Sequence, residues 1–254
     1  MSNVTSKLHN LFPRQPGEKP RTFGSPARVI VTTIAIFIFS QVIAGVYALI
    51  ASILNGSKSI DNSVPIQTVF MLLAEGLAAA FVLMVIKERG LSLKSIGLGR
   101  RPRWSDLGKA FLAFLVYYGL LIVVGLVVNH FAPSVNQEQQ DVGFNNLKGS
   151  TDIALAIISL VILPPIGEET LVRGYLYSGL RSRWSYIPAM LATSLMFGAA
   201  HLDGSDSGLL WSAAVETFIL SLVLVYLREH TGALYAGMLL HATNNIIAFS
   251  VHLH

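Results

Sequence analysis

The chain has 254 residues, of which 53% are hydrophobic and only 13% charged, and it contains no cysteine. A soluble domain usually carries about 25% charged residues, so the composition excludes an ordinary soluble protein. The missing cysteine excludes disulfides, a thiol nucleophile and thiolate metal ligands. The net charge of +4 is explained by basic residues concentrated on one side of the predicted membrane domain, so it needs no nucleic-acid partner.

The chain begins with a polar segment, residues 1–28, that is rich in proline, glycine and basic residues. We predict that it is a disordered cytoplasmic tail and not a signal peptide, because the apolar run that follows is too long for one. Residues 29–254 are predicted to form a single transmembrane domain. The fold class is all-α, a polytopic helical bundle with about seven spans (six to eight). These spans are expected at about 29–54, 64–86, 108–130, 152–180, 185–202, 208–227 and 232–252.

Basic residues are distributed unevenly between the two sides of this bundle. Sixteen of the 18 fall in the tail or in the second, fourth and sixth connections, which leaves only Lys58 and Lys148 for the other side. The positive-inside rule then puts the N-terminus in the cytoplasm, with the protein in the cell membrane. A reporter fused after about residue 100 should read cytoplasmic, and one fused after about residue 140 should read external. The opposite pair of signals would overturn this orientation.

Ionisable groups inside the later apolar segments are the candidate functional residues. Such groups are costly in lipid and therefore mark functional positions by default. Glu168 and His201 are 33 residues apart, and a polar turn at 181–183 lies near their midpoint. Two antiparallel helices joined there would bring both side chains to about the same height. The prolines Pro164 and Pro165 just before are expected to weaken or kink the helix beside Glu168.

Pairs of residues at helical spacing also indicate a functional site. Glu169 and Arg173 are i and i+4, so they share a face and can form an ion pair, leaving Glu168 to point about 100° away. His241 and Asn245 have the same spacing. Each feature alone also has a structural explanation: a bridge for the ion pair, an interfacial position for His201, packing for His241 and interhelical bonding for Asn245. For the mid-helix acids Glu75 and Glu216 we favour structural hydrogen bonding.

Together these residues form three ordered motifs: EExxxR at Glu168, Glu169 and Arg173, FxxxH at Phe197 and His201, and HxxxN at His241 and Asn245. In this set, over about residues 150–250, the chain resembles the CPBP family of intramembrane proteases. That family includes the CAAX prenyl endopeptidases and the bacteriocin-processing or Abi proteins.

The resemblance implies that residues 29–254 are a transmembrane peptidase domain that cleaves a membrane-associated peptide or protein. Glu168 and His201 would activate a water, and His241 with Asn245 would donate hydrogen bonds to the oxyanion. Glu169 and Arg173 would support them.

The resemblance leaves the cofactor open. Glu168, His201 and His241 also form a His₂Glu set of the type that binds catalytic Zn²⁺. We lean to a metal-free mechanism, because no carboxylate is evident that would orient the histidines, apart from Glu169, the natural partner of Arg173. Elemental analysis of the purified protein for zinc would decide between the two.

Two other functions fit the same residues. A proton-coupled transporter could use the buried glutamates and histidines as a relay, although no internal repeat of the transporter type is evident. A non-catalytic immunity or scaffold member of the same fold is the other alternative, although no motif residue is lost.

Overall fold

The computed structural model describes residues 22–56, 63–131, 143–205 and 208–252. Most of the predicted tail, Lys58 and the reporter position near residue 140 lie outside these described residues. The helices of the first half are α2 (Pro26–Leu54), α3 (Val64–Glu88), the 3₁₀ turn η2 (Leu93–Ile96) and α4 (Trp104–Phe131). One nearly continuous helical segment follows, made of α5 (Ser150–Ile157), π-helical η3 (Ile158–Ile162), α6 (Leu163–Glu168), π-helical η4 (Glu169–Tyr177) and α7 (Ser178–Arg181). The remaining elements are α8 (Tyr186–Ala199), the short antiparallel strands β1 (Asp203–Ser205) and β2 (Gly208–Leu210), α9 (Trp211–Thr231) and α10 (Tyr235–His252).

The all-α fold class is confirmed, and the described part of the chain has an apolar helical segment at each of the seven predicted positions. Five of these segments are long and apolar enough to cross a membrane: α2, α3, α4, the continuous segment 150–181, and α9. The shorter α8 has 14 residues. The first span starts at Pro26, three residues before the predicted boundary. Ser25 caps the helix, and a proline suits its first turn.

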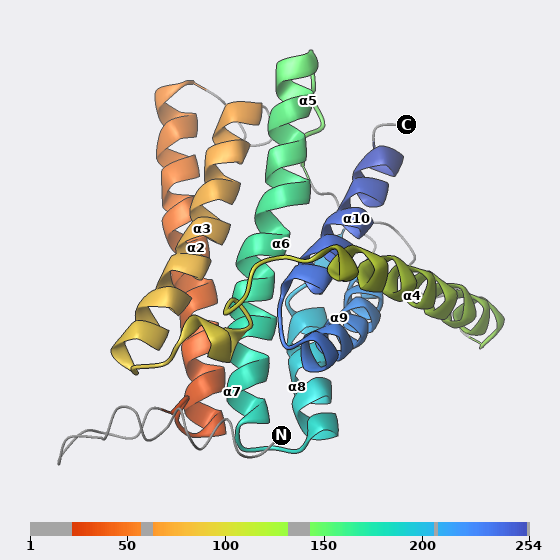
Figure 1. Ribbon diagram of the computed structural model, residues 1–254. Helices are drawn as coiled ribbons and strands as arrows, with labels where there is room; N and C mark the ends of the chain where they lie inside the picture. The colour runs from red at the N-terminus through yellow and green to blue at the C-terminus, as the bar shows by residue number, and fades with distance from the viewer. Residues whose placement is uncertain (1–21, 57–62, 132–142, 206–207, 253–254) are drawn as a thin grey trace.

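Packing separates the helices into two groups that meet along the segment 150–181 (Figure 1). α2 and α3 stand beside that segment on one side, and α8, α9 and α10 lie on the other, while α4 projects away from the bundle. One buried apolar core joins α2, α3, η4, α7 and α8, and a second joins α4, α9 and α10. Outward faces carry many large apolar side chains, such as Val31 at 65% and Leu126 at 65% exposure, as expected for an integral membrane protein in contact with lipid.

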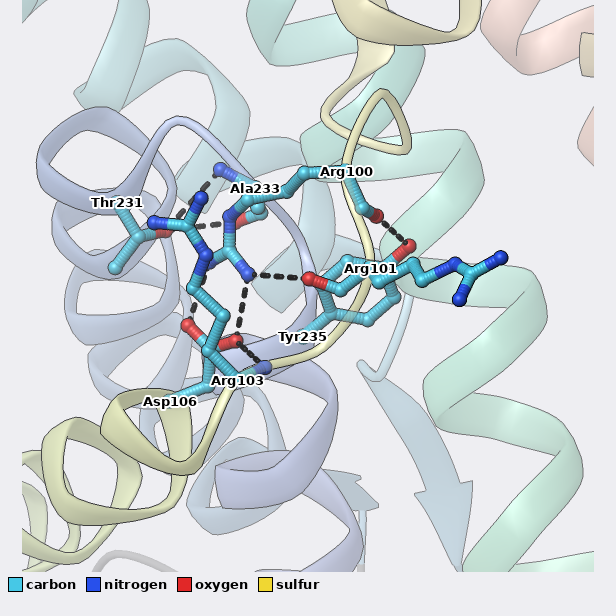
Figure 2. A network of polar contacts seen from close by, with 7 residues as sticks. All are labelled: Arg100, Arg101, Arg103, Asp106, Thr231, Ala233 and Tyr235. Carbon is cyan, nitrogen blue, oxygen red and sulfur yellow. Dashed lines mark hydrogen bonds and ion pairs between the residues drawn. The ribbon is translucent and has the colours of Figure 1, made fainter.

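A polar network fixes the start of α10 against the segment that precedes α4 (Figure 2). The Arg100 guanidinium donates to both oxygens of Asp106, at 2.7 and 2.5 Å, and the Tyr235 hydroxyl donates to the Arg100 carbonyl at 2.6 Å. The hydrogen bonds to Asp106 raise the pKa of Arg100 above its ordinary value. The Leu234 amide also donates to the Gly97 carbonyl at 3.1 Å. The register of α10 is therefore set at its first turn, which determines where its later residues lie.

Candidate active site

The motif residues of the segment 150–181 lie where its helical winding changes twice. η3 and η4 are π-helical and flank the six residues of α6, which end at Glu168. π-Helical turns are rare and occur frequently at functional sites. The predicted disturbance beside Pro164 and Pro165 is therefore present, as a change of winding on both sides of α6. It places Glu168 and Glu169 at the junction between α6 and η4.

Asn245 hydrogen-bonds to a carbonyl that this winding leaves without a backbone partner. Its Nδ2 donates to the Leu160 carbonyl at 2.9 Å. In an α-helix that carbonyl would accept from residue 164, and in a π-helix from residue 165, but both are prolines without an N–H. An unsatisfied carbonyl in lipid costs several kcal/mol, so the Asn245 amide has a clear structural role. An amide nitrogen carries two N–H groups, and this bond engages one of them.

Glu169, Arg173 and His241 form a buried charged chain between η4 and α10. Arg173 Nη1 lies 2.9 Å from Glu169 Oε1, and His241 Nδ1 lies 3.1 Å from the same oxygen. The side chains of Arg173 and Glu169 are 0% and 1% exposed. The predicted i,i+4 pair is confirmed, and Arg173 belongs to this site, not to a basic connection as its place in the charge count implied.

The shared oxygen of Glu169 is a contact that sequence reasoning missed. We expected Glu169 to be committed to Arg173, with no carboxylate left to orient a histidine. The structure shows that one oxygen serves both partners, because α10 crosses η4 at this height. Gly237 on α10 allows this close approach, since a Cβ there would lie 3.3 Å from the other oxygen of Glu169. A carboxylate can only accept, so the His241 Nδ1 must carry the hydrogen.

The second nitrogen of His241 faces Glu168. Its Nε2 lies 3.8 Å from Glu168 Oε2, which is too long for a hydrogen bond. That oxygen is buried and has no hydrogen-bond partner in the described part of the chain. Buried polar atoms are normally paired with protein or water. The Glu168 oxygen is therefore not engaged by His241 or by any other described side chain.

His201 reaches the same region from the end of α8. Its Nδ1 lies 2.9 Å from the Phe197 carbonyl, so this nitrogen carries the hydrogen and Nε2 of the neutral ring is an acceptor. Glu168 and His201 both line a cavity of about 340 Å³ between α2, α3, α6, η4 and α8. The predicted turn between their helices is present at residues 182–185. The predicted water-activating pair is thus placed around one cavity, and its catalytic role stays a prediction.

Phe197 connects the polar groups of the site, a role that sequence reasoning did not give it. Its ring lies 4.2 Å from Arg173 Cζ, in cation–π contact, and its centroid is 4.6 Å from His201 and 6.2 Å from His241. The FxxxH motif was the available signal, because it fixes a ring one turn before the histidine. Phe197 packs Arg173 and both imidazoles around one apolar surface and limits their freedom.

The predicted metal ligands do not form a three-ligand cluster in the described residues. No group of three His, Asp or Glu side chains there is placed closely enough to hold one ion. His241 and Glu168 are neighbours, but His201 does not complete a group of three with them. The arrangement of the described residues thus fits a three-ligand metal site poorly, and we derive no chemical step through a metal.

Comparisons with known proteins find similarity in the part of the chain that carries the three motifs. Residues 150–247 match the model of the Rce1-like family, described as type II CAAX prenyl endopeptidase Rce1-like. An uncharacterized 24.3 kDa protein of Escherichia coli is 38% identical over 96 residues, which are 37% of this chain and 42% of that protein. The similarity thus spans less than half of either chain. No solved structure matches. The family match covers every residue of the three motifs and confirms the resemblance found in the sequence.

Proposed function

We propose, from the match of residues 150–247 to the model of the Rce1-like family, that this protein is an intramembrane endopeptidase. Its substrate is a peptide or protein associated with the bilayer, and water performs the hydrolysis. The observation that carries the proposal is the buried oxygen of Glu168, which faces His241 Nε2 at 3.8 Å and borders the cavity that His201 also lines. In this proposal the N-terminus lies in the cytoplasm, as the basic residues predict.

The first step is the activation of water. Glu168 accepts one proton from a water held in the cavity, and the acceptor Nε2 of His201 orients that water through a second hydrogen bond. The hydroxide then attacks the carbonyl carbon of the peptide bond. A positioned general base of this kind typically contributes about 10²–10⁴-fold in rate.

The second step stabilises the charge that develops on the carbonyl oxygen. His241 donates from Nε2 when the ring is doubly protonated, and Glu169 holds that ring through Nδ1 at 3.1 Å. Asn245 supplies the N–H that does not bond Leu160. Arg173 balances the charge of Glu169. The proton on Glu168 then passes to the leaving amine nitrogen, which breaks the carbon–nitrogen bond and completes the hydrolysis.

Cleavage by purified protein tests this proposal. The protein is reconstituted into lipid vesicles with a library of membrane-anchored peptides of randomised sequence, and products are identified by mass spectrometry. We expect pairs of fragments whose masses sum to the substrate plus one water. Vesicles that show no cleavage but take up protons or solutes would contradict the proposal and support a transporter instead.

A further inference from the structure

The cavity beside Glu168 has a second wall that the proposed mechanism does not use. α6, η4 and α8 form one wall and carry Glu168 and His201, while α2 and α3 form the other. The α2–α3 wall is mainly apolar, with four polar side chains: Thr33, Ser40, Gln41 and Glu75. The Thr33 hydroxyl donates to its own helix at Val29, 2.9 Å away, and the Ser40 hydroxyl to Phe37 at 2.9 Å. Gln41 and Glu75 therefore supply the polar groups that this wall presents to the cavity.

Glu75 is buried in a way that a purely structural role does not explain. It is 8% exposed, and among the described residues its carboxyl interacts electrostatically with Glu168 but takes part in no hydrogen bond. Sequence reasoning favoured structural hydrogen bonding for Glu75, but the described residues supply no donor. A carboxyl group in an apolar environment is expensive without one. A molecule that enters the cavity can supply this donor.

Gly167 allows the carboxyl of Glu75 to lie against the backbone next to Glu168. A Cβ at residue 167 would lie 2.2 Å from Glu75 Oε2 and 2.8 Å from the Glu75 carbonyl oxygen. Any side chain at this position would push α3 away from α6. The two acidic side chains thus lie on facing walls at the same height, and a substrate held by one is presented to the other.

A peptide that is cleaved inside a membrane must find hydrogen-bond partners for its backbone. Its scissile bond must be extended and reachable, and an extended backbone exposes N–H and C=O groups that lipid cannot satisfy. We propose that Gln41 and Glu75 form a subsite that binds this extended backbone, in which Glu75 accepts from a peptide N–H and the Gln41 amide pairs with the neighbouring backbone. This inference rests on the proposed endopeptidase function. It makes Glu75 a residue that positions the substrate against Glu168.

The charged residues that line the cavity favour a neutral donor such as a peptide N–H. Among the described residues that line it, none is Lys or Arg, and the acidic groups are Glu75 and Glu168. A peptide N–H is a donor that needs no counter-charge in the bilayer. The same wall disfavours an incoming carboxylate, since like charges repel strongly at low dielectric.

A substrate series with single atoms removed tests the subsite. In a membrane-anchored peptide that the protein cleaves, each amide near the cleaved bond is replaced in turn by an ester, which removes one N–H donor. The cleaved bond itself stays an amide. With the wild type, we expect one ester position at which kcat/KM falls about tenfold, the order expected when a buried hydrogen bond is lost.

Two variants separate this contact from a structural role. Glu75→Leu should cleave the amide and the ester substrates equally well, because the acceptor is gone. Glu75→Gln keeps an acceptor oxygen and the shape of the side chain. Its ester penalty should stay close to that of the wild type, because the amide oxygen accepts a hydrogen bond in the same place. Glu88→Leu, at the exposed end of the same helix, should keep the full penalty.

Each outcome has one meaning. An ester penalty of the same size in the wild type, Glu75→Gln and Glu75→Leu overturns the subsite while the endopeptidase function stands. Should Glu75→Leu not fold, Glu75→Met, another apolar side chain without an acceptor oxygen, takes its place. A parent peptide that the wild type cleaves nowhere in its sequence overturns the proposed function itself.

Discussion

Replacing Glu168 with glutamine is expected to lower kcat for peptide cleavage by about 10²–10⁴-fold, the range for loss of a general base. Glutamine has almost the same shape, but its amide cannot take a proton from water. The Glu168 side chain is 24% exposed, and its ion pair among the described residues is the 3.8 Å contact with His241. The substitution therefore removes the base and leaves the packing nearly unchanged, so the melting temperature should stay close to that of the wild type.

The matched control is Glu88→Gln, which makes the same chemical change at an exposed position of α3. Both variants are purified in the same detergent, and initial rates are measured at saturating substrate. We expect Glu88→Gln to match the wild type within a factor of about two, since exposed substitutions usually change little. A Glu168→Gln protein that keeps a rate near the control would rule out Glu168 as the base.

Replacing Arg173 with leucine is expected to destabilise the folded protein by about 3–5 kcal/mol, the usual cost of breaking a buried ion pair. The guanidinium is 0% exposed, bonds Glu169 at 2.9 Å and stacks 4.2 Å above the Phe197 ring. Leucine would leave the Glu169 carboxylate buried with His241 as its remaining partner. The free energy of unfolding in mixed micelles should fall, and the melting temperature should fall with it.

An exposed ion pair in the same chain provides the control. Arg181 lies 3.1 Å from Glu229, with the two side chains 40% and 29% exposed. Arg181→Leu should cost at most about 1 kcal/mol, because solvent screens such pairs. Adding Glu169→Gln to Arg173→Leu removes the unpaired charge and should restore part of the lost stability. Equal losses of unfolding free energy in the Arg173 and Arg181 variants would show that the buried ion pair stabilises the fold no more than the exposed one.

The sequence predicted the features that depend on local pattern. Apolar length located the helical segments, and the polar residues at 181–183 located the turn that returns α8 along η4. Helical spacing predicted the pair of Glu169 with Arg173. These succeeded because a helix has a fixed rise and period, so the positions of its side chains follow from the chain alone.

Contacts between distant segments could not be predicted in the same way. The bond from Asn245 to the Leu160 carbonyl joins residues 85 apart. The two prolines indicated that a carbonyl would lack its donor, but nothing in the pattern named the partner. The crossing of α10 over η4, which lets Glu169 hold His241, depends on how whole helices pack. The same is true of Glu75 and Gly167, whose contact is set by α3 against α6.

The π-helical winding of η3 and η4 could also not be predicted from the sequence. Prolines predict that a helix is disturbed, but they do not predict whether the chain continues with α-helical or π-helical hydrogen bonds. The π-helical turns lie on both sides of α6 and place Glu168 and Glu169 at its junction with η4. The i,i+4 spacing had already predicted the pair of Glu169 with Arg173, and the structure adds that Glu168 lines a cavity together with His201.

Cleavage in water enriched in ¹⁸O tests most directly whether Glu168 activates water for attack on a peptide bond. The reconstituted wild type and Glu168→Gln are incubated with one membrane-anchored peptide, and the new C-terminal fragments are weighed by mass spectrometry. The proposed reaction predicts one ¹⁸O atom in the new carboxyl group for the wild type, and almost no labelled fragment for Glu168→Gln. Labelled fragments formed at equal rates by both proteins would contradict it.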